Sequence, residues 1–189
     1  MKKILQKDAP VLRKIAKEIL VKEIKTPKIQ KVLKEMSLAL ASQSDGVAIA
    51  APQIGYSLRI FLVSGKIFTK NFEEDRQTRI ESEGEKFLNE NNIIKEEEVV
   101  LKDLVFINPK ISKLSREKEW VPEGCLSVRP IYGKTHRSKK ALVTAYDENG
   151  KKFTRGGSGL LAQIFQHETD HLNGILFIDH AKELREEPL

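Results

Sequence analysis

The chain has 189 residues, of which 40% are hydrophobic and 32% are charged, as is typical of one soluble globular domain with its own core. No apolar run approaches the roughly 18 residues of a membrane span. The first residues show neither the long apolar core nor the cleavage site of a signal peptide. We therefore expect a single domain over residues 1–189, no membrane partner and a cytoplasmic location.

The net charge is +6, and basic residues are concentrated in segments 134–140 and 151–155. Such an excess favours encounters with anionic partners, although a run of lysines is also typical of a solvated face. No strong nucleic-acid-binding motif is present, so we expect no specific nucleic-acid site. The single cysteine, Cys125, excludes an internal disulfide and is either a small buried apolar side chain or a reactive or metal-binding thiol.

The first predicted helix begins at Thr26 and Pro27, with threonine as the N-cap and proline at the first helical position. Apolar residues then recur at helical spacing, and the helix should end before Asp45. This apolar stripe consists of Ile29, Val32, Leu33, Met36 and Leu40. Residues 46–53 are small and apolar and break the pattern, whereas residues 59–63 predict a buried strand.

The composition then becomes strongly polar, which predicts a surface insertion at about 64–103 with no chemical role. After the insertion, strands are predicted at 105–108 and 141–146. The Glu-Asn-Gly sequence at 148–150 predicts a turn into a further strand at 152–154.

A second long helix is expected to open with the glycine-rich segment 156–159 and to end at Gly174, where a C-terminal glycine belongs. The apolar residues between them follow helical spacing. We therefore expect an α+β fold in which antiparallel or mixed strands pack around this central helix.

The second helix carries an H-E-x-x-H sequence at residues 167–171. Residues four apart lie on the same helix face, so His167 and His171 can share one metal ion. Glu168 follows the first histidine, and from there its carboxylate can act as a general base on a water molecule without ligating the metal. The alternative is two surface histidines spaced by chance.

A catalytic metal usually takes a third protein ligand as well as water. One large endopeptidase group supplies a further histidine three residues after the glycine, but Phe177 occupies that position here. The better candidate is Cys125, because a thiolate beside two imidazoles suits Fe²⁺ or Zn²⁺.

Three segments together resemble the peptide deformylase family. Residues 46–53 resemble its first motif, G-x-G-x-A-A-x-Q, and residues 123–127 match its second, E-G-C-L-S, in full. Residues 166–172 match its third, Q-H-E-x-D-H-L, and residues 8–13 resemble its N-terminal segment. The motifs follow the family's order, and the conjunction of the last two is highly specific.

This resemblance implies hydrolytic removal of the formyl group from newly made peptides that begin with formylmethionine. It also implies one divalent metal ion, generally Fe²⁺, with Zn²⁺ or Ni²⁺ able to take its place. Cys125, His167 and His171 would bind the ion. Nascent formylmethionyl peptides are the expected partners, and the basic surface could aid a transient contact with ribosomal RNA.

The developing oxyanion needs hydrogen-bond donors aimed at it. By resemblance these donors are the Gln53 side-chain amide and the Leu126 backbone N–H. Seen outside the motif, Gln53 would be interpreted as an ordinary surface-loop glutamine.

The methionine side chain needs an apolar slot, although every candidate for its wall is equally well explained as ordinary core. The residues assigned to substrate binding are Gly46, Val47, Ala48, Val121, Gly124, Leu160 and Ile164. Ala48 departs from the first motif, which has a second glycine there, and its methyl group could crowd the edge that receives the substrate. Glu123 and Asp170 are either supports for the metal ligands or members of structural ion pairs.

Two other kinds of protein remain open. A zinc endopeptidase would share H-E-x-x-H but take its third ligand from a downstream Glu, and the candidates at 183, 186 and 187 leave little room for the necessary helix. A structural or ribosome-associated protein stapled by a metal would need four protein ligands, with His136 and His180 as spare histidines.

Overall fold

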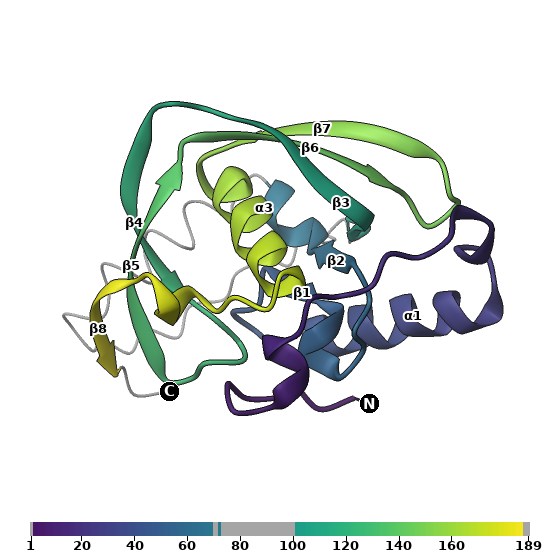
Figure 1. Ribbon diagram of the computed structural model, residues 1–189, viewed down its shortest axis with the longest axis horizontal. Helices are drawn as coiled ribbons and strands as arrows, with labels where there is room; N and C mark the ends of the chain where they lie inside the picture. The colour runs from purple at the N-terminus through teal and green to yellow at the C-terminus, as the bar shows by residue number, and fades with distance from the viewer. Residues whose placement is uncertain (1, 70–71, 73–100, 187–189) are drawn as a thin grey trace, which may run out of the picture.

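The computed structural model describes residues 2–69, 72 and 101–186 (Figure 1). Most of the predicted insertion at 64–103 therefore lies outside the described residues. The two ends of this segment lie together, because the Gly65 N–H donates a hydrogen bond to the Asp103 carboxylate at 3.2 Å. Gly65 also packs so closely on Leu101 that an added Cβ would lie 2.0 Å from the Leu101 carbonyl oxygen.

Two antiparallel sheets form the framework of the described residues. The five-stranded sheet has the order β1-β2-β3-β6-β7, and the three-stranded sheet has the order β4-β5-β8. The first sheet comprises β1 (Ala48–Ala50), β2 (Ile60–Val63), β3 (Leu104–Leu114), β6 (Lys140–Tyr146) and β7 (Lys152–Ser158). The second comprises β4 (Lys118–Gly124), β5 (Ile131–Ser138) and β8 (Lys182–Glu186). The predicted mixed α+β class with antiparallel strands is confirmed.

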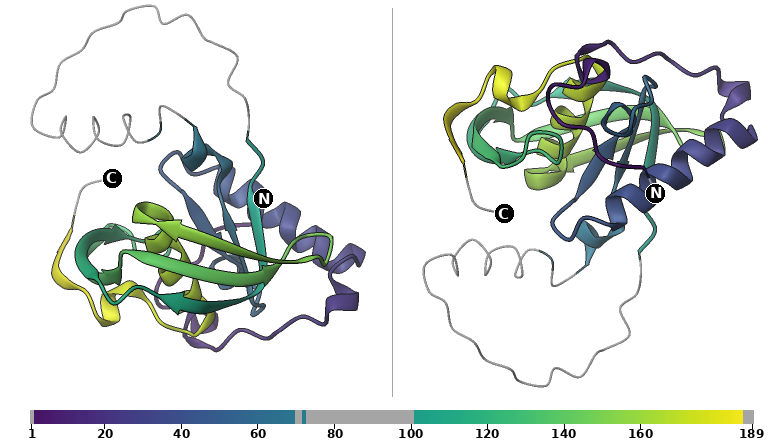
Figure 2. Two further views of the ribbon diagram at one scale, coloured as in Figure 1. Left: turned by 90° about the horizontal axis from the view of Figure 1, so that it is seen from above. Right: turned by 90° about the horizontal axis from the view of Figure 1, so that it is seen from below.

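Two α-helices occupy different places in this framework. Helix α3 (Gly159–Leu172) contacts strands of both sheets, whereas α1 (Pro27–Ala41) lies at the opposite end of the molecule from β4, β5 and β8 (Figures 1 and 2). The short 3-10 helices are η1 (Pro10–Arg13), η2 (Val21–Glu23), η3 (Ala51–Ile54), η4 (Gly65–Phe68) and η5 (Phe177–Asp179). None of the described helices combines the length and apolarity that crossing a membrane requires.

The predicted first helix is confirmed as α1, and all five residues of its apolar stripe are buried. Pro27 occupies the first turn, as expected. The Thr26 side chain does not cap the helix, because its hydroxyl donates to the Glu23 carbonyl oxygen at 2.7 Å instead of accepting from the helix.

The predicted opening of the second helix at 156–159 is wrong by three residues. Gly156, Gly157 and Ser158 end strand β7, where they pair with β6, and the helix begins at Gly159. A Cβ at Gly157 would lie 2.8 Å from Leu161, so glycine lets the helix fold back onto its own strand. The predicted end at Gly174 is confirmed, and this glycine has a left-handed φ of 76°.

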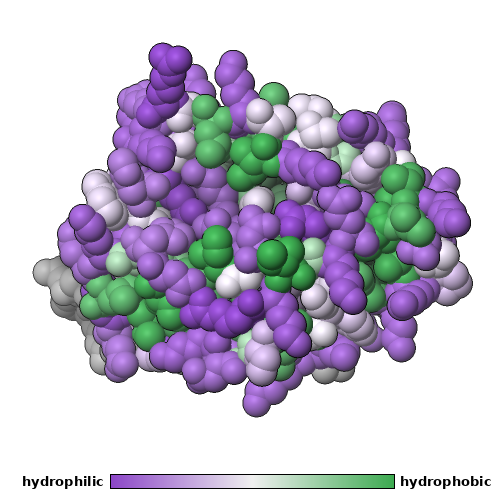
Figure 3. Space-filling model, viewed as in Figure 1, coloured by the Kyte–Doolittle hydropathy of each residue, from purple (hydrophilic) through white to green (hydrophobic). Residues whose placement is uncertain are grey.

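Helix α3 is seated on the five-stranded sheet by aromatic packing. The Phe61 and Phe106 rings stack at a centroid distance of 4.6 Å, and Phe165 of α3 meets the Phe106 ring edge-on at 5.2 Å. All three side chains are fully buried. The face seen in Figure 3 is mostly hydrophilic, and its apolar side chains form separate patches.

Gln166 fixes the rotation of α3 against strand β5. Its side-chain carbonyl accepts from the Ser138 N–H at 3.0 Å, and its amide donates to the Ser138 carbonyl at 2.9 Å. Because Gln166 is buried and uses both ends of its amide, rotating the helix would leave polar groups unsatisfied. The directions of the adjacent His167 and Glu168 side chains are thereby set.

Strand β3 is longer than the predicted strand at 105–108, because its pairing with β6 resumes after an irregularity at Asn108. Asn108 has a φ of 50°, and its buried side chain bonds both the N–H and the carbonyl of Ile19, at 2.8 and 2.6 Å. Asn108 therefore bends the strand and ties the N-terminal segment to the sheet.

Asn108→Ala should lower the free energy of unfolding by about 2–3 kcal/mol, because the Ile19 N–H and carbonyl lose their partners and alanine is strained at positive φ. Urea denaturation followed by circular dichroism measures the change. Lys113→Ala, on an exposed position of the same strand, should stay within about 0.5 kcal/mol of the unaltered chain. Equal stability of the two variants would contradict the role of Asn108.

Candidate metal centre and active site

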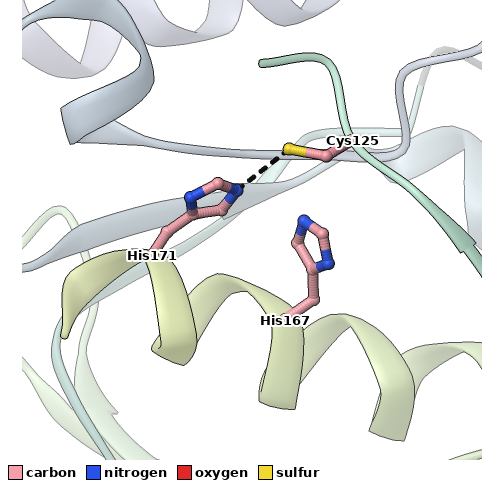
Figure 4. Close-up of side chains that lie close together, drawn as sticks. All are labelled: Cys125, His167 and His171. Carbon is pink, nitrogen blue, oxygen red and sulfur yellow. Dashed lines mark hydrogen bonds between the residues drawn. The ribbon is translucent and has the colours of Figure 1, made fainter. Parts of the chain in front are cut away.

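Cys125, His167 and His171 converge on one point (Figure 4). Cys125 directly follows β4, and both histidines project from α3 one turn apart. One ligand atom from each residue lies within 4.8 Å of the others, and Cys125 Sγ lies 3.1 Å from His171 Nε2. The structure thus brings together the three residues that the sequence proposes as ligands.

The chemistry of these donors fits a divalent metal ion. Bonds of about 2.0–2.3 Å to nitrogen and sulfur place donor atoms roughly 3–4 Å apart, which agrees with the observed clustering. One sulfur and two imidazole nitrogens form a borderline-soft set that suits Fe²⁺, Zn²⁺ and Ni²⁺. Among the described residues, Cys125, His167 and His171 are the group of potential ligands that lie close enough together to hold a metal ion.

Glu123 of β4 holds the first histidine. Its carboxylate lies 2.6 Å from His167 Nδ1, so a proton on Nδ1 leaves the Nε2 lone pair for a metal. Burial favours the neutral carboxyl group, but the neighbouring His167 and Arg137 outweigh burial and hold the pKa of Glu123 well below its usual range. Glu123 therefore makes both contacts that the sequence leaves open: a hydrogen bond with His167 and an ion pair with Arg137.

Two residues of β5 also donate hydrogen bonds to this carboxylate. Thr135 donates to it at 2.6 Å, and Arg137 donates two hydrogen bonds at 2.7 and 3.0 Å. Arg137 also donates to Asp170 of α3 at 2.6 Å, which makes Asp170 a member of an ion pair.

Sequence reasoning missed Arg137, because the basic segment 134–140 was interpreted as a solvated face. The strand alternates: Thr135 and Arg137 are buried, whereas Lys134 and His136 are exposed. The period of two, together with the threonine between the basic residues, is the signal that could have identified Arg137.

Glu168 is buried beside the ligand cluster, with 4% of its surface exposed. Its Oε2 atom has no hydrogen-bond partner among the described residues. Burial is the main cause that raises the pKa of Glu168 to about 7. The site therefore contains a carboxyl group that is free to exchange a proton near neutral pH.

Gln53 lies in η3 and is 2% exposed, which rules out a surface-loop glutamine. Its side-chain carbonyl accepts from the Ala50 N–H at 2.8 Å. This bond directs the amide nitrogen toward Ser127 Oγ and Cys125 Sγ, at 3.1 and 3.6 Å. The amide donor is thus held next to the ligand cluster.

Leu126 follows Cys125 and faces the first motif. Its carbonyl accepts from Gln6 at 3.1 Å, and its side chain is 3.3 Å from a Cβ built on Gly46. The Leu126 N–H donates no hydrogen bond within the described part of the chain. The segments that carry Gly46, Gln53 and Cys125 therefore meet at one place.

Other proposed substrate residues lie on two sheet edges. Ala48 is the first residue of β1, at one edge of the five-stranded sheet, and Val47 directly precedes it. Val121 and Gly124 lie on β4, at one edge of the three-stranded sheet. Gly124 packs on the Tyr132 ring, which a Cβ would approach to 2.5 Å.

Ala48 does not crowd the β1 edge, because its side chain packs into the core and the residue is 7% exposed. Its φ is also not positive, because the non-glycine residues with positive φ in the described chain are Asn108 and Glu183. Ile164 belongs to the same core cluster and Leu160 packs against it, as the ordinary-core interpretation of these two residues expects.

Comparison with known proteins places the chain in a family. The model of the polypeptide deformylase family matches residues 1–187. A peptide deformylase of Borreliella burgdorferi is 38% identical over 156 residues, which cover 82% of this chain and 74% of that protein. Peptide deformylase 2 of Clostridium acetobutylicum is 36% identical over 183 residues, 97% of each chain.

Solved structures of peptide deformylases are also similar to this chain. The crystal structure of a peptide deformylase from Legionella pneumophila has a TM-score of 0.73 at 31% identity, and the match covers 97% of this chain and 87% of that one. A peptide deformylase from Acinetobacter baumannii with bound Met-Ala-Ser has a TM-score of 0.74 at 26% identity, with coverage of 95% and 98%.

The match to the family model and the similarity to known relatives therefore extend along almost the entire chain. The chain belongs to the peptide deformylase family, the metal-dependent hydrolases that remove the N-formyl group from newly made polypeptides.

Proposed function

We propose that Cys125, His167 and His171 hold one divalent metal ion and that Glu168 is the general base of deformylation. The supporting observation is the arrangement itself: three donor atoms cluster within 4.8 Å beside a buried carboxylate that has an unpartnered oxygen. These residues lie on α3 and on the loop after β4. We propose α3 as the central helix of a single domain over residues 1–189, from which a surface insertion at about 64–103 departs between β2 and β3.

A bound ion of this kind supplies Lewis-acid chemistry, which acidifies water and polarises a carbonyl group. We propose Fe²⁺ as the native ion, with Zn²⁺ or Ni²⁺ as possible replacements, because a thiolate and two imidazoles suit all three. Metal quantification after anaerobic purification distinguishes them.

Glu168 carries the proton during the reaction. It takes a proton from the attacking water, whose oxygen bonds to the formyl carbon, and later passes that proton to the nitrogen of the leaving amine. The formamide C–N bond breaks, and the products are formate and a peptide with a free α-amino group. A buried carboxyl group whose Oε2 atom meets no donor in the described part of the chain suits this exchange.

Two donors stabilise the negative charge that develops on the formyl oxygen. These are the Gln53 side-chain amide, which the Ala50 N–H orients, and the backbone N–H of Leu126. A donor of this kind typically contributes about 3–4 kcal/mol to lowering the barrier. The Ala50 N–H holds the Gln53 amide beside the ligand cluster, and the N–H that points toward Cys125 Sγ at 3.6 Å would turn to the formyl oxygen when substrate binds.

The substrate backbone lies along the edges of β1 and β4 that have no neighbouring strand among the described residues, with Gly46, Val47, Ala48, Val121 and Gly124 beside it. An extended peptide can pair with such edges through its own N–H and carbonyl groups. Leu160 and Ile164 contribute apolar surface for the methionine side chain. The Met-Ala-Ser peptide in the Acinetobacter baumannii structure is a ligand of the expected chemistry.

The two rival interpretations have less support. Phe177, at the position of the third histidine in one endopeptidase group, is buried and packs near His167 at a ring distance of 6.3 Å. A structural metal site would need a fourth protein ligand. Among the described residues, the ligand cluster contains three, and the exposed His136 and His180 are not part of it.

Cys125→Ala should abolish stoichiometric metal binding, because two imidazoles alone form a much weaker site. Metal per chain is measured after gel filtration with a weak chelator. His136→Ala and His180→Ala are matched controls and should retain the ion. A Cys125→Ala variant with a full complement of metal would instead favour the endopeptidase interpretation.

Glu168→Ala should retain the metal and lose at least roughly 100-fold in the rate of formyl-Met-Ala-Ser hydrolysis, since proton transfer contributes factors of this size. The measurement combines an anaerobic formate-release assay with metal quantification. Glu117→Ala, on the exposed surface, should leave the rate unchanged. Wild-type activity in the Glu168 variant would refute the assignment of the base.

We also propose that the protein acts in the cytoplasm on nascent chains and makes a transient ribosome contact through its basic surface. Lys151, Lys152 and Arg155 are exposed on and beside β7. Attraction to RNA phosphates should weaken steeply as salt concentration rises.

Cosedimentation with ribosomes should therefore fall several-fold between 50 and 200 mM salt, on the order expected for a few phosphate contacts. The double variant Lys151→Glu, Lys152→Glu should bind more weakly than Lys31→Glu, Lys34→Glu, which makes the same charge change on α1. Absent or salt-independent association would eliminate the ribosome contact and leave the deformylase assignment intact.

A further inference from the structure

We propose that Arg137 is a positioning residue that holds His167 in its metal-binding form and so determines how tightly the protein retains its ion. The inference rests on the proposed role of His167 as a ligand. It concerns a residue outside the three ligands, the base and the oxyanion donors.

Arg137 grips the Glu123 carboxylate at two points. Its Nη2 donates to Oε1 at 2.7 Å, and its Nε donates to Oε2 at 3.0 Å. This two-point contact fixes the plane of the carboxylate as well as its position. Both side chains are almost fully buried, at 8% and 3% exposed, so solvent competes little with the contact.

The same Glu123 Oε1 lies 2.6 Å from His167 Nδ1. A carboxylate in this position accepts the Nδ1 proton and directs the Nε2 lone pair toward the ligand cluster. The other donors to Glu123, Thr135 and Gln163, both reach Oε2, at 2.6 and 3.4 Å. Arg137 therefore shares with His167 the oxygen that faces the histidine.

The third contact of Arg137 links the sheet to the helix. Its Nη1 donates to Asp170 Oδ2 at 2.6 Å, and Asp170 lies on α3 next to His171. His180 also approaches this carboxylate, with Nε2 at 3.9 Å. One guanidinium group thereby sets the separation between β4, which leads to Cys125, and the helix that carries both histidines.

A lysine cannot replace this arrangement, because an ammonium group is a point donor and lacks the planar fork. The charge would survive in Arg137→Lys, but the two-point contact with Glu123 and the link to Asp170 could not be made together. Arg137→Gln removes the charge as well. Comparing the two variants therefore separates the effect of losing the positive charge from the effect of losing the two-point contact.

The test measures Zn²⁺ affinity by chelator competition in folded protein. Loss of a group that orients a metal-binding histidine typically weakens affinity 10- to 100-fold. We expect a loss in this range for Arg137→Gln and a smaller loss for Arg137→Lys. Arg13→Gln is the matched control, because Arg13 pairs with Asp179 at a half-exposed site, and it should bind Zn²⁺ like the unaltered chain.

A spectroscopic readout separates positioning from general stability. In the Zn²⁺-loaded protein, the His167 Nδ1 proton should give a downfield NMR resonance that reports its short hydrogen bond to Glu123. This resonance should shift upfield or disappear in both Arg137 variants and persist in Arg13→Gln. If Arg137→Gln does not fold, Arg137→Lys and the isosteric Thr135→Val, which keeps the fork and should keep the resonance, decide the question.

Unchanged affinity and an unchanged resonance in a folded Arg137 variant would overturn the inference, as would an equal loss in Arg13→Gln. Failure of the proposed function has a different signature. In that case the unaltered chain itself would bind no Zn²⁺ that depends on Cys125.

Discussion

The Glu123 carboxylate is the group on which the rest of the site depends. Burying an ionised carboxylate is costly unless charges and hydrogen bonds surround it, and removing one partner from such a group is strongly destabilising. Here His167, Arg137 and Thr135 supply the partners from α3 and β5. The carboxylate is satisfied when the helix and both strands occupy their observed places, so the requirement that stabilises this group also places His167.

The fold meets this requirement by holding one helix against two sheets. The Phe61, Phe106 and Phe165 cluster attaches α3 to the five-stranded sheet through apolar packing, which by itself tolerates some rotation. Gln166 removes that freedom through its paired bonds to Ser138, at the end of β5. Apolar contacts thus supply much of the attraction, while directional polar contacts select the single orientation that points both histidines at Cys125.

Much of this could be predicted from the sequence, where a local pattern carries the information. Helical periodicity identified α1, and H-E-x-x-H at a spacing of four put both histidines on one face of α3. Residues whose roles depend on contacts with distant parts of the chain are harder to predict from the sequence. Arg137 resembled its neighbouring surface lysines, because its role depends on Glu123 and Asp170, which are distant in the chain. The start of α3 was misplaced because glycines at 156 and 157 are equally compatible with a helix opening and with a strand that a helix packs against.

The division of the three proposed ligands between a helix and a loop affects the stability of the folded chain. The two histidines come from one rigid helical turn, whereas Cys125 comes from the loop after an edge strand, so an ion that joins them also joins the helix to the three-stranded sheet. Binding to this assembled site stabilises the folded chain, because the unfolded chain cannot present the same three atoms together. The buried Glu168 opposes that gain, because burial disfavours the charged form of its carboxyl group and its Oε2 atom has no donor among the described residues. Stability gained from the Glu123 network, and from the proposed ion when it is bound, therefore makes the buried Glu168 carboxyl group tolerable in the core.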